Sequence, residues 1–325
     1  MTRELFYGDA IQEAIIQTMK ADDRVTIFGE DVRDYGGVFG VTQGLSNDFA
    51  KDRVRSTPLS EAAILGDAVG QALYGLRPIA EIQFCDFITV GMSQIVDLMA
   101  NYRYRNGTNL PIVVRMPAGG MLNIGNFHSN CWENWFCHVP GLKIVVPATA
   151  HDAKGLLIAA VNDPDPVLYF EQKYMYRFIK DEVPEEMYEV PIGKANVVTE
   201  GKDISLITYG DMLLTAKEAQ KKLKEEGIEL EVIDLRTLVP LDKECILTSF
   251  KKTKRAIILH EARKYAGFGG EIAGMLAEEA FDYMAAPIVR LGAKFTPVPM
   301  NPALEKQYLP SLQDVMDAAH KLMKY

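Results

Sequence analysis

The stretch LKIVVPATAHDAKGLLIAAVNDPDPVLYFE (142–171) decides the fold class, because apolar runs at its two ends enclose a longer helical pattern. The runs LKIVVP (142–147) and PVLYFE (166–171) are apolar at consecutive positions. Such runs suit strands that are covered on both faces, as in a parallel sheet. The stretch therefore predicts a strand–helix–strand unit of an α/β protein.

The same alternation continues in both directions along the chain. Ser60 precedes an apolar helical stripe as a cap, and Ser311 with Asp314 predicts a capping box for the last helix. The other strand candidates are VTIFG (25–29), RPIAEIQF (77–84), PIVVRM (111–116), DISLITYG (203–210), ELEVIDL (229–235), RAIILHE (255–261) and PIVRLG (287–292). We therefore expect mainly parallel sheets that are flanked by helices.

The length of 325 residues predicts two domains, at roughly 150 residues each. The segment DEVPEEMYEVPIGK (181–194) contains two prolines and no periodicity, which is typical of a linker. The predicted domains are residues 1–185 and residues 186–325. In parallel sheets ligands bind outside the carboxyl ends of the strands, so we look for the chemistry there.

Composition excludes several classes of protein. The 44 acidic and 35 basic residues give a net charge of −9, which argues against general nucleic-acid binding. No apolar run reaches the roughly 18 residues that a membrane helix needs. The charged amino terminus does not resemble a signal peptide, and the four cysteines form no C-x-x-C pair. A cytoplasmic protein with reduced thiols fits these features.

Common catalytic and nucleotide motifs are missing. The chain contains no P-loop, no G-x-S-x-G elbow and no G-x-G-x-x-G after a strand, and GFGGEIAG (267–274) has the wrong glycine spacing. His260 and Glu261 begin a zinc-protease pattern that Lys264 breaks. The cluster of His128, Cys131, Cys137 and His138 has zinc-binding side chains, but adjacent ligands at 137 and 138 disfavour tetrahedral geometry. Buried structural cysteines are the preferred interpretation.

A succession of motifs carries a resemblance over nearly the whole chain. The motifs are STPLSEAAILGDAVGQALYG (56–75), RPIAEIQFCDF (77–87), RNGTNLPIVVRMPAGG (105–120), HSNCWENWFCHVPGLKIVVPATAHDAKGLL (128–157), DPDPVLYFE (163–171), VPIGKA (190–195), ITYGDM (207–212) and VIDLRTLVPLD (232–242). In this order they resemble the β chain of the thiamine-diphosphate-dependent first component of 2-oxo-acid dehydrogenase complexes. The resemblance implies a pyrimidine-binding domain followed by a transketolase C-terminal-like domain for dimerisation and partner docking.

The resemblance also implies a shared cofactor. In the family the α chain holds the diphosphate and Mg²⁺ through a G-D-G motif with a later asparagine, and the β chain presents the pyrimidine end. The nearest matches in this chain are Gly8-Asp9-Ala10, Gly66-Asp67-Ala68 and Gly210-Asp211-Met212, and none is G-D-G. We therefore expect an α2β2 heterotetramer in which an α subunit binds the diphosphate.

Four residues match the pyrimidine site of the family. Glu61 matches the glutamate that hydrogen-bonds a pyrimidine nitrogen and favours the imino tautomer; without the resemblance it is an acid in the first turn of a helix, where it complements the dipole. Phe87 matches the aromatic residue that stacks on the ring; without the resemblance it would be interpreted as a core residue. Leu59 and Gln83 match positions that line the ring; otherwise they are a loop anchor and a polar strand end.

His128 matches a histidine beside the reaction centre of the family. The resemblance implies that it acts as a general acid–base or oxyanion group and assists acyl transfer to the lipoyl group of the second component. Asn130 departs from the commoner H-S-Q pattern, and this departure bears on substrate identity more than on mechanism. A lone loop histidine is otherwise solvated or structural.

Some family members hold a structural potassium ion in the β chain. The matching positions are the backbones of Ile112, Ala160 and Val161 together with Asp163 and Asp165. Carbonyl and carboxylate oxygens suit a hard cation. A D-P-D-P turn without an ion explains the same residues nearly as well.

Several functions stay open at this stage. The preferred one is the β subunit of a lipoamide-dependent pyruvate or branched-chain 2-oxo-acid dehydrogenase that works with a lipoyl acyltransferase. AEIQFCDF (80–87) resembles branched-chain enzymes, whereas YRFIKDEVPEEMYEVPIGKA (176–195) resembles bacterial pyruvate enzymes. An acetoin enzyme, the C-terminal half of a split transketolase and a non-catalytic scaffold are the alternatives.

Overall fold

The computed structural model describes residues 2–325, which fall into two compact units. One unit contains the chain up to Ala118 together with Trp135–Ile192. The other contains Gly119–Asn134 and Gly193–Tyr325. Residues 119–134 thus group with the second unit, although the sequence on both sides of them belongs to the first. The predicted division at residues 185 and 186, with the roles given to each part, stays a prediction.

Parallel strands form the sheet of the first unit, in the spatial order β6, β7, β5, β4, β2, β3. Every residue of β2, β5 and β7 is buried, as expected for strands with helices on both faces. The strands are β2 (Val25–Glu30), β3 (Val54–Thr57), β4 (Arg77–Glu81), β5 (Val113–Ala118), β6 (Lys143–Val145) and β7 (Val167–Gln172). The prediction of a parallel sheet is confirmed.

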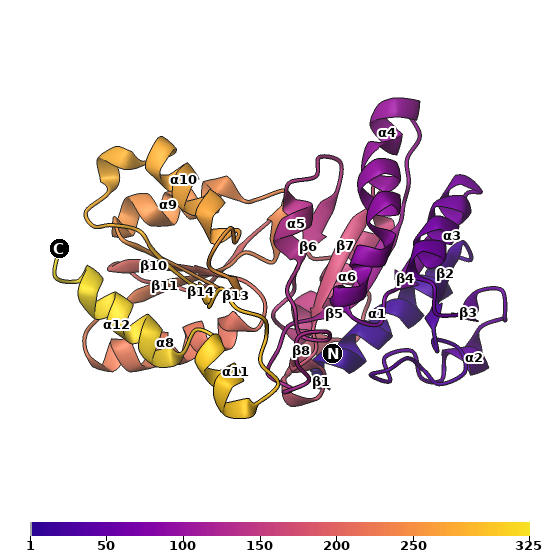
Figure 1. The fold of residues 1–325 in the computed structure, drawn as a ribbon, viewed down its shortest axis with the longest axis horizontal. Helices are drawn as coiled ribbons and strands as arrows, with labels where there is room; N and C mark the ends of the chain where they lie inside the picture. The colour runs from indigo at the N-terminus through magenta and orange to yellow at the C-terminus, as the bar shows by residue number, and fades with distance from the viewer. Residues whose placement is uncertain (1) are drawn as a thin grey trace. The chain divides into compact units, whose positions relative to one another are not determined.

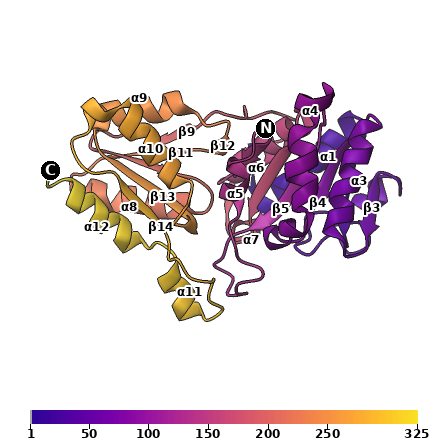
Figure 2. The same ribbon diagram turned by 45° about the horizontal axis from the view of Figure 1, so that its top comes forward.

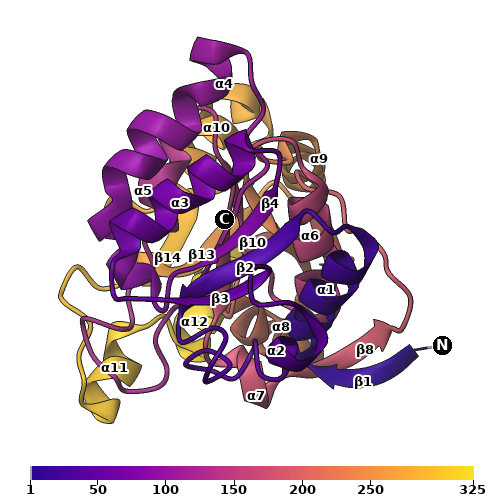
Figure 3. The same cartoon turned by 90° about the vertical axis from the view of Figure 1, so that its right-hand side faces the viewer.

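Helices cover both faces of this sheet. Figure 3 shows α3 (Glu61–Leu73) and α4 (Ala100–Asn106) on one side of β2 and β4, and α1 (Tyr7–Ala21) and α6 (Ala150–Asn162) on the other. Apart from His151, helix α6 is buried from Ala150 to Val161, and its small residues let it lie deep in the unit. The shorter helical segments are α2 (Leu45–Asp48), η1 (Cys85–Gly91), η2 (Gln94–Met99), α5 (Glu133–Cys137) and α7 (Met175–Phe178).

Two local predictions in the first unit are wrong. Residues 181–184, expected in a linker, belong to strand β8 (Lys180–Pro184), which pairs antiparallel with β1 (Thr2–Phe6). Both strands lie largely at the surface, so they lack the apolar runs that identified the other strands. Ser60 occupies the N-cap of α3 as predicted, but its side chain makes no capping hydrogen bond.

The second unit is also a layered α/β structure. Its sheet has the order β14, β13, β10, β11, β9, in which only β9 runs antiparallel to its neighbour. Figures 1 and 2 show α9 and α10 on one face of the sheet and α8 and α12 on the other. The elements are β9 (Asn196–Thr199), β10 (Ile204–Thr208), α8 (Met212–Glu225), β11 (Leu230–Asp234), β12 (Thr237–Val239), α9 (Lys243–Thr253), β13 (Ala256–Arg263), α10 (Gly269–Glu279), η3 (Phe281–Tyr283), β14 (Val289–Ala293), α11 (Pro302–Tyr308) and α12 (Leu312–Leu322).

The capping box of the last helix is confirmed. The Ser311 hydroxyl accepts a hydrogen bond from the backbone N–H of Asp314, and the Asp314 carboxylate accepts one from the backbone N–H of Ser311. Reciprocal bonds of this kind satisfy two donors that the first turn of a helix leaves without partners. Val315 and Ala319 are buried as the stripe predicts, whereas Met323 lies beyond the helix end and is partly exposed.

The glycine-rich segment 267–274 packs around a buried histidine. A Cβ atom at Gly267 would lie 2.7 Å from the ring of His260, and one at Gly269 would lie 2.8 Å from it. Burial lowers the pKa of His260 to about 4, so its ring is neutral at pH 7. Close packing against this ring explains Gly267 and Gly269.

No helix within residues 2–325 combines the length and the apolar character that spanning a membrane requires. In the same residues, no group of three or more His, Cys, Asp or Glu side chains has an arrangement suited to a metal ion.

Candidate functional site

The candidate site lies where three neighbouring parallel strands of the first unit end. Strand β2 pairs with β3 on one side and with β4 on the other. Glu30 is the last residue of β2 and lies opposite Thr57, the last residue of β3. The chain after β3 leads to Leu59 and Glu61, and the chain after β4 leads to Gln83 and Phe87. The topology thus places the four predicted pyrimidine-site residues at one edge of one sheet.

Exposure of these side chains suits a surface that binds a partner molecule. Leu59 is 82% exposed. Glu61, the first residue of α3, is half-buried, as are Gln83 and Phe87. The Phe87 ring packs edge-on against Phe84 at a centroid distance of 5.8 Å. The same sheet edge therefore carries an apolar side chain, an aromatic side chain and a carboxylate that is not fully buried.

Glu30 is a site residue that the sequence analysis missed. Its side chain is 4% exposed, and neither carboxylate oxygen makes a well-formed hydrogen bond. Burial and then the negative charges of Glu61 and Asp31 raise the pKa of Glu30 to about 7, while the backbone N–H of Ser60 lowers it in part. Glu30 and Glu61 are thus close enough to interact electrostatically. Its position at the carboxyl end of a buried strand was the signal that could have identified it.

A buried ion cluster lies across the neighbouring strands. The Arg115 guanidinium on β5 donates from Nε to Glu171 Oε1 (2.7 Å) and from Nη2 to Glu171 Oε2 (2.6 Å). It also donates to Glu81 at the end of β4, and the Tyr176 hydroxyl donates to Glu171. Burial raises the pKa of Glu81. The cluster ties β4, β5 and β7 together beside the site.

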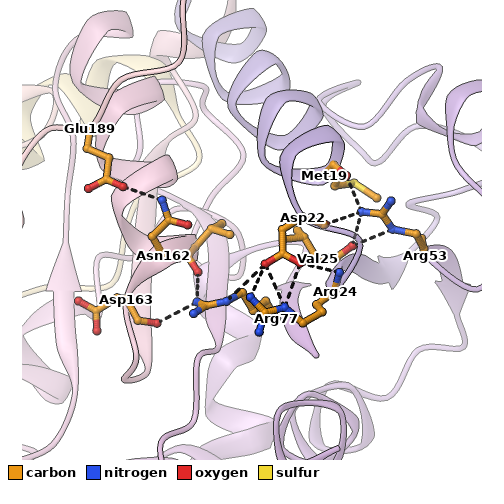
Figure 4. A network of polar contacts seen from close by, with 10 residues as sticks. Met19, Asp22, Arg24, Val25, Arg53, Arg77, Asn162, Asp163 and Glu189 are labelled. Atoms are coloured by element: carbon orange, nitrogen blue, oxygen red, sulfur yellow. Dashed lines mark hydrogen bonds and ion pairs between the residues drawn. The ribbon is translucent and has the colours of Figure 1, made fainter. Parts of the chain in front are cut away.

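The carbonyl groups of the predicted potassium site already accept hydrogen bonds from the protein. Arg77 Nη1 lies 2.6 Å from the Val161 carbonyl oxygen and 3.5 Å from that of Asp163, and Figure 4 shows this side chain between Asp22 and Asp163. The carbonyl oxygen of Ile112 accepts from the Val167 backbone N–H at 2.9 Å, and that of Ala160 accepts from the Asp163 N–H at 3.3 Å.

The two aspartates of this site are paired with cationic side chains. Lys143 Nζ lies 2.6 Å from both carboxylate oxygens of Asp163, and Arg103 Nη1 lies 2.5 Å from Asp165 Oδ2. An ammonium and two guanidinium groups thus supply the positive charge that a hard cation would supply. As they stand, Val161, Asp163 and Asp165 do not fit a potassium ion, because their oxygens are engaged by side chains that would have to move away.

His128 belongs to the second unit and is half-buried. It lies on the segment 119–134, where its backbone N–H donates to the Gly125 carbonyl at 3.2 Å. Glu133 on the same segment is buried and accepts a hydrogen bond from the Tyr209 hydroxyl at 2.9 Å. Burial raises the pKa of Glu133 to about 7, although the Tyr209 hydroxyl lowers it. The segment therefore combines a histidine with a buried carboxyl group that titrates near neutral pH.

Two protein-family models match consecutive parts of the chain. Residues 3–178 match the pyrimidine binding domain of transketolase, and residues 193–315 match the transketolase C-terminal domain.

Curated relatives match from end to end. The chain is 45% identical over 322 residues to the 2-oxoisovalerate dehydrogenase subunit beta of Bacillus subtilis (strain 168), which covers 98% of each chain. It is 42% identical over 318 residues to the pyruvate dehydrogenase E1 component subunit beta of the same organism, covering 97% of this chain and 98% of the relative. The chain belongs to the family of 2-oxo-acid dehydrogenase β subunits. The predicted resemblance is confirmed.

Membership in this family makes the chain an enzyme subunit of the oxidoreductase class with thiamine-diphosphate-type domains. A split-gene transketolase, described as an inactive β4 tetramer, has the same fold, with a TM-score of 0.78 over 98% of both chains. At 21% sequence identity, this likeness supports the fold class of two mainly parallel α/β domains and nothing further. Its coverage leaves no large part of the fold unmatched.

A third relative is of another substrate type. The acetoin:2,6-dichlorophenolindophenol oxidoreductase subunit beta of Bacillus subtilis (strain 168) is 43% identical over 337 residues, covering 99% of this chain and 98% of the relative. The identities to the three substrate types thus differ by no more than three percentage points, from 42% to 45%. Overall identity within the family does not discriminate among their substrates.

Proposed function

We propose that the chain decarboxylates pyruvate or a branched-chain 2-oxo acid on thiamine diphosphate and passes the acyl group to a lipoyl group. The observation that carries the site assignment is the Glu30–Glu61 pair at the carboxyl ends of β2 and β3. When bound, thiamine diphosphate supplies the carbon nucleophile and the electron sink for the decarboxylation. The protein residues orient reactants and hold protons.

Glu61 is the proposed catalytic carboxylate. It stands at the exposed side of the pair and would hydrogen-bond a ring nitrogen of the pyrimidine, while Glu30 lies behind it in the protein. Because the pKa of Glu30 is about 7, this residue carries a proton in about half of the molecules at pH 7. A proton on Glu30 removes the negative charge of this residue from the neighbourhood of Glu61.

The remaining residues of this edge would bind the pyrimidine. Phe87 offers an aromatic face for stacking, Leu59 offers an exposed apolar contact, and Gln83 offers an amide. Because no G-D-G motif is present, the diphosphate and Mg²⁺ would be held by an α subunit. We propose an α2β2 heterotetramer that serves a lipoyl acyltransferase component.

His128 is the proposed acid–base group of the acyl-transfer half of the reaction. Its half-buried side chain is accessible enough to reach a substrate, and an imidazole can both donate and accept a proton. Potassium is not part of the proposal, because Arg77, Lys143 and Arg103 already occupy the acceptors. Four free cysteines agree with a cytoplasmic location, which we retain as a prediction.

Co-expression with a G-D-G-containing α partner tests this function. We would compare kcat/KM for pyruvate, 3-methyl-2-oxobutanoate and acetoin, and measure acyl transfer to a lipoyl domain. Glu61→Gln should lower decarboxylation by a factor of about a hundred or more, because it removes the charged hydrogen bond to the pyrimidine. The matched control Glu4→Gln changes an exposed glutamate of β1 and should leave the rate unchanged.

Each alternative has its own outcome in this assay. Preference for acetoin would reassign the substrate, and ketol transfer without acyl transfer to lipoyl protein would favour a split transketolase. Full activity of the Glu61→Gln enzyme would remove Glu61 from the catalytic site. If wild-type chain assembled with its partner but turned over none of the substrates, a scaffold role would replace the enzyme.

A further inference from the structure

The loop that carries His128 is closed on itself. The backbone N–H of Gly119 donates to the Asn130 carbonyl at 3.3 Å, so the two ends of the segment 119–130 meet. The side-chain amide of Asn130 donates to the Asn126 carbonyl within the same segment. Compact loops with joined ends are frequently functional. We call residues 119–130 the His128 loop.

The first half of this loop has an unusual backbone. Positive φ angles alternate along it, at Gly119 (85°), Met121 (68°), Asn123 (57°) and Gly125 (80°). A positive φ is unfavourable for a residue such as methionine and persists only where its surroundings enforce it. Alternation of this kind can turn successive backbone N–H groups toward one point, which creates a concavity that binds anions.

Two buried carboxylates occupy that concavity. Glu305 on α11 accepts from the Met121 N–H at Oε1 (3.1 Å) and from the Asn123 N–H at Oε2 (3.0 Å). Glu261 on β13 accepts from the Gly120 N–H at Oε1 (2.5 Å). A Cβ atom at position 120 would lie 2.8 Å from Glu305 and 3.2 Å from Glu261, so a larger residue there would push against both carboxylates.

A contribution to folding stability does not by itself explain why two carboxylates are buried against this loop. Glu305 and Glu261 are 3% and 5% exposed, and Glu261 Oε2 is buried without a hydrogen-bond partner. Burying carboxylates is unfavourable, and unsatisfied buried oxygens are rare outside sites with a function. What the two carboxylates specify is a single conformation of the backbone between Gly119 and Asn123.

The second half of the loop, which contains His128, is attached at further points. The Asn126 side-chain oxygen accepts from the Val298 N–H at 3.4 Å, and the Asn130 side-chain oxygen accepts from Arg263 Nη2 at 3.0 Å. His128 lies between these attachments, and its N–H donates to Gly125, the last residue with positive φ. A change in the backbone at Met121 and Asn123 would therefore be transmitted to His128 through the closed loop.

We propose that Glu305, supported by Glu261, is a positioning residue that fixes the His128 loop and thereby the orientation of His128. This inference rests on the catalytic role proposed for His128. Glu305 touches neither substrate nor cofactor in this role. It acts through the backbone N–H groups of Met121 and Asn123, as a carboxylate bound by the protein's own loop.

Hydrogen exchange tests the attachment directly. In the full-length chain purified with its α partner, the amides of Met121 and Asn123 should exchange at least about tenfold faster in Glu305→Ala than in wild type, because each loses a charge-assisted hydrogen bond. Glu305→Gln keeps the side-chain volume and one acceptor oxygen, so its effect should be intermediate. Glu278→Gln, an exposed glutamate of α10, is the matched control and should exchange like wild type.

Kinetics distinguish positioning from a general structural role. Glu305→Ala should lower kcat for acyl transfer by about tenfold with little change in KM for the 2-oxo acid, and adding it to His128→Ala should cause no further loss. Unchanged exchange of Met121 and Asn123 in a folded Glu305→Ala protein would overturn the proposal, as would losses that simply add. If His128→Ala alone left acyl transfer intact, the role proposed for His128 would fall, while the exchange data would still decide whether Glu305 holds the loop.

Discussion

At the scale of single residues, Glu30 shows how burial at the end of a strand changes the pKa of a carboxyl group. The strand VTIFGE (25–30) is buried at every position, and its final glutamate is 4% exposed. Burial and the Glu61 charge raise the pKa of Glu30 to about 7. The folded protein therefore keeps a proton on Glu30 between pH 4.5 and 7, a range in which the unfolded chain has lost it.

This shift predicts how stability depends on pH. Because the folded state binds the extra proton, the contribution of Glu30 is favourable below pH 4.5 and is lost as the pH rises through 7. Glutamine does not ionise, so Glu30→Gln should not show this loss. The free energy of unfolding of the variant minus that of wild type should therefore rise by roughly 2 kcal/mol from pH 5 to pH 8. Urea unfolding at the two pH values measures the gain. A constant difference between the proteins would show that Glu30 titrates normally.

The residue scale also shows what sequence can reveal about the site. Leu59, Glu61, Gln83 and Phe87 were placed by resemblance, and the structure puts all four at one sheet edge, although their roles remain predictions. Glu30 carries no motif, because its raised pKa arises from burial and from a charge on a different element. Glu305 lies 182 residues from its hydrogen-bond partner Asn123, so no local pattern could connect them.

At the scale of elements, strands were predictable where both faces are buried. Strands β2, β5 and β7 are buried throughout, and the apolar runs within them identified them. Strands β1 and β8 were missed because they pair with each other near the surface, with alternating exposure and charged residues. The residues 181–184 carry the acids of a linker but make a ladder with β1, a long-range pairing that overrides local composition.

The ion cluster of Arg115 makes β4, β5 and β7 depend on one another. Arg115 is 1% exposed and Glu171 is fully buried, so neither charge has access to water if the other is removed. Arg115→Ala should lower the free energy of unfolding by about 3–5 kcal/mol. The control Arg24→Ala breaks the exposed Arg24–Asp22 pair and should change it by less than about 1 kcal/mol. Equal effects of the two substitutions in urea unfolding would show that the buried cluster contributes no more to stability than the exposed ion pair.

The contacts between the end of α6 and the start of β7 predict that potassium does not change the thermal stability of the protein. Lys143 and Arg77 engage the oxygens that a potassium ion would need. The melting temperature should therefore be the same in KCl and in NaCl of equal ionic strength, and Lys143→Met should lower it in both, because Asp163 loses its cation. A higher melting temperature for wild type in KCl would mean that the ion displaces these side chains.

At the scale of the whole molecule, the missing diphosphate motif supports the proposal that the cofactor is bound by the assembly and not by this chain alone. The chain offers a carboxylate pair, an aromatic side chain and an exposed leucine to a pyrimidine, but no G-D-G motif. Family membership supplies the reason, because relatives of this length are named as β subunits of larger enzymes. We therefore propose that an α partner contributes the groups that hold the charged end of the cofactor.

This division predicts a large difference between the isolated chain and its complex. The isolated chain should bind thiamine diphosphate at least about a hundredfold more weakly than the complex with Mg²⁺, since the charge-assisted hydrogen bonds and the metal are missing. Titration calorimetry measures both affinities, with thiamine as the control ligand. The affinity for thiamine should differ far less between the isolated chain and the complex, because thiamine lacks the diphosphate. Tight binding of thiamine diphosphate by the isolated chain would instead require a phosphate site within this sequence, and the shared-cofactor assembly would no longer follow.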